Sequence, residues 1–135
     1  MMEDRGERTG TGEATATEEP AVDETVIEQL ASITDSEGFS VLGELLNAFL
    51  TTVPARLDAL DEALAAGNLG AVADQAHALT GSSASFGARG MAELCRELRA
   101  AAVRGDLEAA RPPVRALHDE FLRVRSWLVA FRSAT

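Results

Sequence analysis

Residues 76–88, AHALTGSSASFGA, place a histidine inside a helical segment in which glycine, serine and alanine replace nearly every bulky side chain. On a helical wheel at about 100° per residue, one stripe collects the apolar and small residues that should face the core. The residues of this stripe are Val72, Ala76, Leu79, Ser83 and Phe86. His77 lies about 140° from the centre of the stripe, so the ring is predicted to point outward.

The face around His77 carries only small side chains. Ala73, Thr80, Gly81 and Ala84 share it, and none is larger than threonine. A solvated helix face normally carries long charged side chains, and a glycine inside a helix costs about 1 kcal/mol relative to alanine. A bare surface of this kind would let a second protein reach the ring closely. We therefore expect Ala73 and Ala84 to contact a docking partner.

The chain on both sides of this segment also shows helical periodicity. A stripe of apolar residues from Leu42 to Leu64 keeps its phase across Pro54, which predicts one long helix. The last helix is expected to begin at Pro112 and Pro113, after a separate turn over residues 107–111. The other expected helices are residues 23–33, 69–86 and 88–104. Short glycine-containing turns join them, so the predicted fold is all-α, an antiparallel up-down four-helix bundle with a short additional N-terminal helix.

Composition and charge narrow the classes of function. The chain has 135 residues, a net charge of −10, one cysteine, and arginine as its sole basic residue type. Residues 1–22 are acidic and lack apolar periodicity, so we expect a disordered tail before a single bundle domain over 23–135. The acidic balance argues against nucleic acid. No signal peptide or membrane span is evident, and a cytoplasmic protein without membrane contact is expected.

An imidazole can act as a nucleophile or a base, but His77 has no suitable partners for a self-sufficient reaction. Ser82 and Ser83 are too near it in sequence on the same helix to form a triad. His118 is the other histidine, and no HxxxH or CxxC spacing indicates a metal site. A glycine-rich phosphate loop is also missing from the sequence. What remains is a histidine that accepts a group delivered by a partner.

The segment HALTGSSASFGA resembles the signature of histidine-containing phosphotransfer (HPt) domains, which reads roughly H-x-L-K-G-S/A-S/A-x-x-x-G-A. The matching positions are His77, Leu79, Gly81, Ser82, Ser83, Gly87 and Ala88. The flanks FLTTVPARLDALDEALAAGN and ELCRELRAAAVRGDLEAA are similar to the family's pattern as well. The resemblance covers about residues 25–132.

The resemblance implies that His77 is the phosphoacceptor of a multistep phosphorelay. The phosphoryl group would come from an aspartyl phosphate on a response-regulator receiver domain, or from a sensor histidine kinase, expected to be hybrid, and would then be passed on. The receiver would supply Mg²⁺ and most of the charge neutralisation, so this chain would need no cofactor or metal of its own and would not be an enzyme by itself. Gly81 would admit the partner's loops, and the protein is expected to act as a monomer.

The departure from the family lies at position 80, where Thr80 replaces the usual lysine. A threonine can donate a hydrogen bond but carries no charge, so without a nearby cation phosphorylation should be slower or the phosphohistidine differently stable, and Thr80→Lys should speed transfer to His77. Arg99, on the next helix, falls where the family often places a polar residue near the phosphohistidine. It could supply the missing cation, although an ordinary solvated arginine would fit the sequence equally well.

Two other readings of the whole chain remain open. The loss of the lysine is compatible with a helical adaptor that docks on and sequesters receiver domains without carrying phosphate. A histidine-dependent hydrolase would require activity of the isolated chain. Of the remaining residues, His118 is expected at the boundary of the core, Cys95 as an inert buried thiol, and Trp127 as a packing residue.

Overall fold

The described part of the chain is built from helices. The computed structural model describes residues 20–34 and 41–134. Its helices are α2 (Glu24–Ala31), α3 (Val41–Ala65), α4 (Leu69–Ser85), α5 (Arg89–Val103) and α6 (Leu107–Ala134). The prediction of an all-α fold is confirmed, and α3 continues through Pro54 as one helix. The predicted disorder of residues 1–19 lies outside the described residues.

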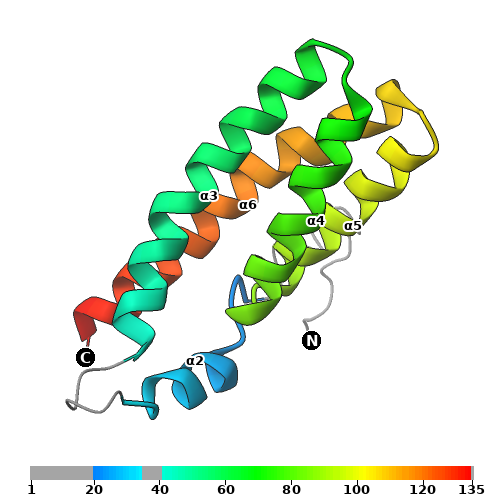
Figure 1. Cartoon of the computed structure of the whole chain (residues 1–135). Coiled ribbons are helices and arrows are strands. Elements are labelled where there is room, and N and C mark those ends of the chain that lie inside the picture. Colours follow the sequence, from blue (N-terminus) through cyan, green and yellow to red (C-terminus); the bar gives the residue numbers. More distant parts are fainter. Residues whose placement is uncertain (1–19, 35–40, 135) are drawn as a thin grey trace, which may run out of the picture.

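Helices α3 to α6 form an antiparallel bundle (Figure 1). Each packs against its neighbours along the chain, and α3 also packs against α6, which closes the bundle. The connections are short because α3, α4 and α5 are each followed, two residues later, by a glycine with positive φ: Gly67, Gly87 and Gly105. In all three turns the next residue donates its N–H to a carbonyl five residues back, the pattern of a Schellman motif. The chain therefore reverses within three residues at each turn.

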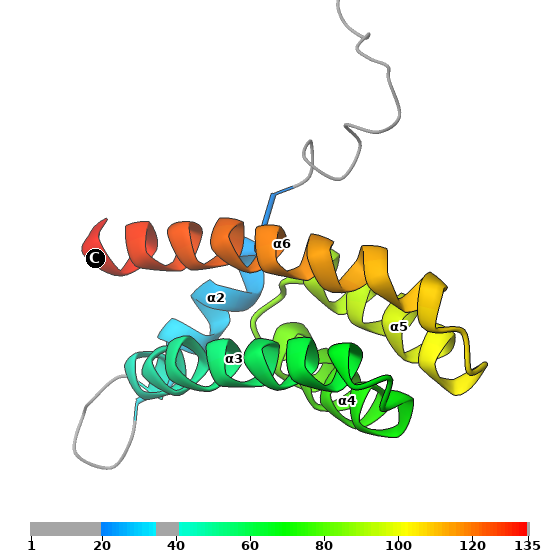
Figure 2. The ribbon, with the colours of Figure 1, turned by 90° about the horizontal axis from the view of Figure 1, so that it is seen from above.

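Helix α2 fills one end of the bundle. Figures 1 and 2 show it between α3 and α6, where these two long helices extend beyond α4 and α5. Asp23 caps it by accepting a hydrogen bond from the Thr25 N–H at 3.0 Å, and Ile27 is fully buried. Ala21 and Val22 are buried as well. The folded part therefore begins before the expected boundary at residue 23, because these two apolar residues pack into the core without belonging to a helix.

The core runs the length of the bundle and consists of residues spaced three or four apart on each helix. Phe49 of α3 joins two other rings in it, with ring centroids 4.8 Å from Phe86 and 6.1 Å from Phe121. Leu79 and Leu98 are fully buried and anchor α4 and α5. The position of α4, and with it the direction of its outer face, is thus fixed by packing on both sides.

The start of α6 differs from the prediction. The helix begins at Leu107, and Pro112 and Pro113 lie inside it. Asp106 provides the start signal, because its side chain accepts a hydrogen bond from the Ala109 N–H at 3.0 Å. Ala110 is fully buried, so the first turn also gains packing. The cap and this burial together outweigh the backbone hydrogen bonds that the two prolines remove.

Candidate functional site

The inner face of α4 is the one that the wheel predicts. Val72, Ala76, Leu79 and Ser83 are fully buried, and Phe86 nearly so. Small residues at 76 and 83 let α4 lie close to its neighbours, chiefly α5. The hydroxyl of Ser83 is buried without a hydrogen-bond partner among the described residues. These contacts fix the rotation of α4 and thereby decide which residues face outward.

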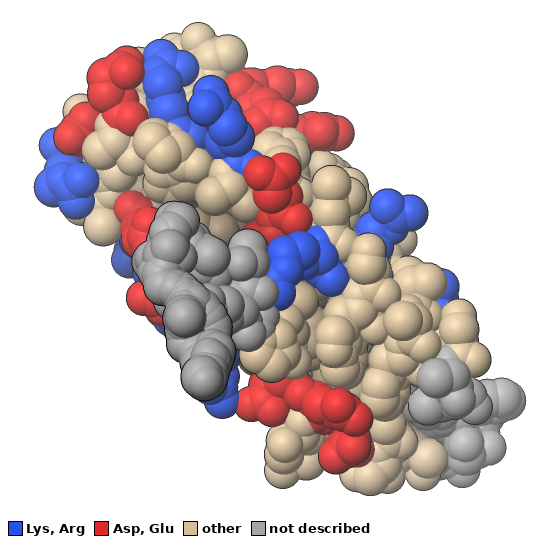
Figure 3. Space-filling view, turned by 180° about the vertical axis from the view of Figure 1, so that it is seen from behind, with Lys and Arg blue, Asp and Glu red and all other residues tan. Residues whose placement is uncertain are grey.

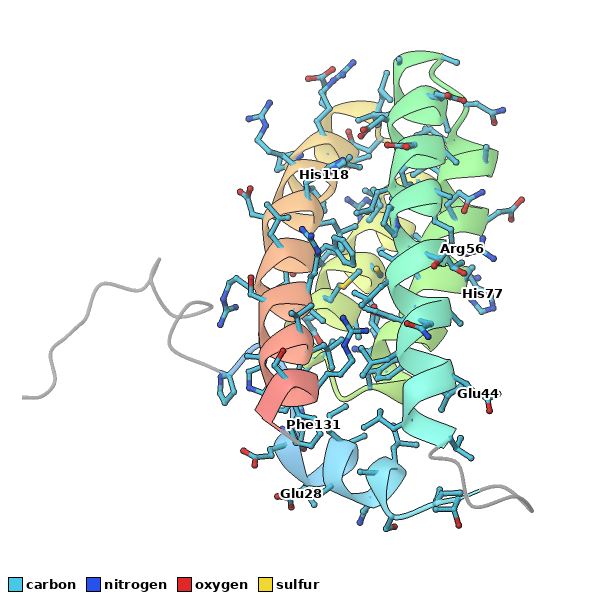
Figure 4. The ribbon with its side chains drawn as sticks, turned by 90° about the vertical axis from the view of Figure 1, so that its left-hand side faces the viewer. Glu28, Glu44, Arg56, His77, His118 and Phe131 are labelled. Carbon is cyan, nitrogen blue, oxygen red and sulfur yellow. The ribbon has the colours of Figure 1, made fainter. Side chains whose placement is uncertain are left out.

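His77 lies on the outer face of α4 and is exposed. Figure 4 shows its ring projecting from the edge of the bundle, away from the core. Within the described part of the chain, no hydrogen bond or ion pair holds the ring. An unpaired, exposed imidazole is available to react with a group brought from outside.

The side chains around His77 are short, as the sequence predicts. Gly81 and Ala84 are exposed, whereas Ala73 and Thr80 are half-buried, and Ala73 packs against the core. A Cβ built on Gly81 would meet no atom within 4 Å, so nothing inside the described chain requires glycine there. The bare part of the face is therefore the side toward Gly81 and Ala84.

The hydroxyl groups near His77 are already used by α4 itself. Thr80 Oγ1 donates to the Ala76 carbonyl at 2.8 Å. Ser82 Oγ donates to the Ala78 carbonyl at 3.3 Å. Each of these bonds satisfies the hydroxyl within one helical turn. The Thr80 hydroxyl, which was expected to be able to donate to a phosphoryl group, thus donates to the backbone of its own helix instead.

A hollow of about 510 Å³ adjoins His77 on the side of α5. His77 and Thr80 form its α4 wall. The α5 wall consists of Arg96, Arg99, Ala100, Val103 and Arg104. The structure thus brings Arg99 to His77, as the sequence allowed, and adds two arginines that sequence reasoning missed. For Arg96 the available signal was its spacing of three positions from Arg99, which places both on one side of α5; Arg104 directly follows the last residue of α5.

A second hollow, of about 200 Å³, lies on the opposite side of α4, against α3. Its rim includes Leu45, Ala48 and Thr52 from α3 and Ser82 and Ser85 from α4, and Phe49, Val53 and Phe86 also line it. Leu45 is one of the few large apolar side chains that remain exposed. Leu45 lies within the apolar stripe from Leu42 to Leu64 and would be expected to be buried, so nothing in the sequence pattern predicts this surface.

The other residues singled out from the sequence lie outside both hollows. His118 Nε2 lies 3.0 Å from Asp61 Oδ1, joining α6 to α3. Cys95 is buried, and burial raises the pKa of its thiol to about 12, against a smaller opposite effect of Arg96. Trp127 stacks on Phe131 with ring centroids 5.4 Å apart. All three have packing or surface contacts that account for them.

Three further findings concern the described residues as a whole. Figure 3 shows acidic and basic side chains interspersed on the face opposite to that of Figure 1. In residues 20–34 and 41–134, no three His, Cys, Asp or Glu side chains gather so that they could hold a metal ion. No helix among these residues is long and apolar enough to cross a bilayer.

Comparison with known proteins identifies the family. The model of the Hpt domain matches residues 44–127. Among solved structures, histidine-containing phosphotransfer protein B (HptB) from Pseudomonas aeruginosa PAO1 is similar, with 31% sequence identity and a TM-score of 0.78. The match covers 86% of this chain and 97% of that one. No curated protein sequence matches the chain.

Proposed function

The chain belongs to the family of Hpt domains, and from this premise we propose that it carries a phosphoryl group on His77 between partner proteins of a phosphorelay. The observation that supports the proposal most directly is the position of His77. Its ring is exposed, has no partner among the described residues, and stands on a helix face without bulky neighbours. This is the geometry that a receiver domain needs in order to close over the ring.

The proposed reaction is a displacement at phosphorus. A ring nitrogen of His77 attacks the phosphorus atom of an aspartyl phosphate on the receiver with its lone pair, and an N–P bond forms. The bond between phosphorus and the carboxylate oxygen breaks, and the carboxylate leaves with the electron pair. The receiver would bring the Mg²⁺ that neutralises developing charge. This chain contributes the nucleophile and its position, which is a large part of catalysis in phosphoryl transfer.

We further propose that the partners are receiver domains and a sensor histidine kinase, expected to be hybrid, and that they dock on the face around His77. Gly81 and Ala84 form the exposed part of that face, and Ala73 contributes only a half-buried edge. The hollow beside Leu45 adds an apolar surface on the side of α3. Interfaces of this transient kind are at the small end of the size range. The chain is proposed to act as a monomer.

One observation favours a second candidate function. Thr80 stands where the family usually has lysine, and its hydroxyl donates to the Ala76 carbonyl, so α4 offers the phosphoryl group no cation. A chain that had lost phosphotransfer could still dock on receivers as an adaptor. The two candidates differ in one measurable respect, because only the carrier forms phosphohistidine.

The test is to incubate the purified chain with a phosphorylated receiver and Mg²⁺ and to look for an acid-labile, base-stable phosphoryl group. The carrier function predicts label on the wild type and none on His77→Gln. His118→Gln is the matched control, because His118 is engaged with Asp61 and should leave labelling unchanged. Receivers that bind the wild type but never transfer phosphate to it would instead establish the adaptor.

A further inference from the structure

A phosphoryl group on His77 would meet little positive charge on its own helix. Helix α4 contains no arginine or lysine, and its one ionisable residue besides His77 is Asp74, one turn before the histidine. A phosphoryl group bound to a side chain carries about −1.5 to −2 charges near neutral pH. With Thr80 hydrogen-bonded to Ala76, stabilisation of that charge from within this chain has to come from a neighbouring helix.

One such source is the hollow between α4 and α5; on the side of α3, Arg56 instead donates a hydrogen bond to Gln75 at 3.0 Å. Three of the hollow's lining residues, Arg96, Arg99 and Arg104, are basic, and none is acidic. Arg96 is partly occupied, because its Nη1 lies 3.2 Å from Glu93 Oε1. Neither Arg99 nor Arg104 forms an ion pair with another described residue. Two guanidinium groups beside His77 are therefore available.

The size and lining of the hollow also suit an oxyanion. Its volume of about 510 Å³ leaves space for a phosphoryl group together with some of its water, since one liquid water molecule takes about 30 Å³. Ala100 and Val103 give part of the wall an apolar character, but both are exposed, so solvent partly screens the charges beside them. Guanidinium groups keep their charge at all relevant pH values and can donate two parallel hydrogen bonds to phosphoryl oxygens.

From these contacts we infer that the hollow is an oxyanion site in which Arg99 and Arg104 bind the phosphoryl oxygens at His77, in place of the lysine that position 80 lacks. The role of this site, binding a phosphoryl group on His77, rests on the proposed function. Its chemistry, the binding of an oxyanion by two arginines, does not. The two arginines do not react with the phosphoryl group; they attract the incoming group and hold it in line with the ring. Both are thus binding and positioning residues.

The experiment has two readouts that can fail separately. In the first, inorganic phosphate is titrated into the unphosphorylated full chain, and NMR follows the guanidinium signals and the His77 ring. We expect saturable shifts at Arg99 and Arg104 but not at Arg115, an exposed arginine of α6 outside the hollow. The shifts should weaken in Arg99→Gln and Arg104→Gln. Non-saturable shifts of equal size at all three arginines would overturn the inference.

In the second readout, phosphoramidate replaces the receiver. The ring nitrogen of His77 attacks its phosphorus atom, the P–N bond of phosphoramidate breaks, and ammonia leaves with the electron pair and a proton from solvent. Mass spectrometry measures the rate of labelling. We expect Arg99→Gln and Arg104→Gln each to slow it roughly three- to tenfold, the loss of a partly screened charge-assisted hydrogen bond. Arg115→Gln should not slow it, and Arg99→Lys should restore part of the rate.

The outcomes separate the two proposals. Normal labelling of His77 in every arginine variant would overturn the role of the hollow and leave the carrier function intact. A second outcome is that phosphate binds at Arg99 and Arg104 but that neither phosphoramidate nor receivers label His77. This result would retain the anion site and overturn the carrier function. Slower transfer from receivers, with no phosphate binding and unchanged labelling by phosphoramidate, would show that the arginines contact the partner's carboxylates, which also overturns the inference.

Discussion

Gly87 is the residue whose replacement should affect the fold most specifically. It ends α4 with a φ of +70°, and its carbonyl accepts a hydrogen bond from the Asp23 N–H at 2.9 Å. A Cβ at this position would lie 2.9 Å from the Asp23 Cβ and 3.1 Å from the Val26 Cβ. Carbon atoms in contact prefer about 3.5–4.0 Å. Gly87→Ala therefore requires both a strained backbone and a displacement of the start of α2.

The cost can be estimated from these two effects. A left-handed conformation costs a residue other than glycine about 1–2 kcal/mol, and a less flexible unfolded chain returns about 0.4–1 kcal/mol. Overpacking adds about 1–3 kcal/mol. We expect the free energy of unfolding to fall by about 2–4 kcal/mol, which would lower the urea midpoint by about 1–2 M.

Two other glycines supply matched controls. Gly67 and Gly105 end their helices with φ of +69° and +77°, but a Cβ on either would meet nothing within 4 Å. Alanine at these positions should cost only the backbone strain, about 1 kcal/mol. Urea unfolding followed by circular dichroism compares the three variants. If Gly87→Ala is no less stable than the two controls, the contact between α2 and the end of α4 does not constrain position 87, and the reasoning fails.

Three further predictions concern stability and exchange with partners. Gly81→Ala should stabilise the helix by up to about 1 kcal/mol yet slow phosphoryl transfer from a receiver. The control Gly70→Ala should leave this transfer unchanged. Equal transfer rates in both variants would show that Gly81 has no role in docking. Because Cys95 has a raised pKa of about 12 and the chain lacks lysine and tyrosine, the free energy of unfolding should decline from about pH 9 toward pH 12, and Cys95→Ala should abolish that slope. A Cβ on Gly90 would lie 2.8 Å from Glu120 Oε2, the end of a flexible side chain. Displacing this carboxylate should offset the helix-propensity gain of Gly90→Ala, so urea unfolding should change by less than about 1 kcal/mol, whereas in a Glu120→Ala background the same substitution should stabilise by up to about 1 kcal/mol.

Much of the site could be predicted because a helix encodes its own faces. The 3.6-residue period is enough to place Leu79 inside and His77 outside, whatever the neighbouring helices do. The glycine turns were equally local, since Gly67 and Gly87 each end a helix and reverse the chain. These features depend on residues close together in sequence, so one sequence contains the information.

The features that could not be predicted depend on packing between segments. Which arginines of α5 stand beside His77 follows from the register between α4 and α5, and wheels of single helices do not contain it. Ala21 and Val22 are buried by elements that follow them in the chain. At Pro112 the preference of proline for the first turn of a helix competed with the cap at Asp106, and the helix begins at the cap. In the first two cases a tertiary contact decided; at the start of α6 the local cap of Asp106 and the burial of Ala110 decided together.

The structure also changes the expectation for Thr80→Lys. From the sequence, the substitution should restore a missing charge and speed phosphorylation of His77. In the structure the hollow beside Thr80 already holds Arg96, Arg99 and Arg104, and a further cation would be repelled by them. We now expect Thr80→Lys alone to change the rate of labelling by less than about twofold. In the Arg99→Gln background the same substitution should restore most of the lost rate. A double-mutant cycle measures this coupling between positions 80 and 99. Equal acceleration by lysine in both backgrounds would show that positions 80 and 99 act independently, and that the arginines do not replace the lysine.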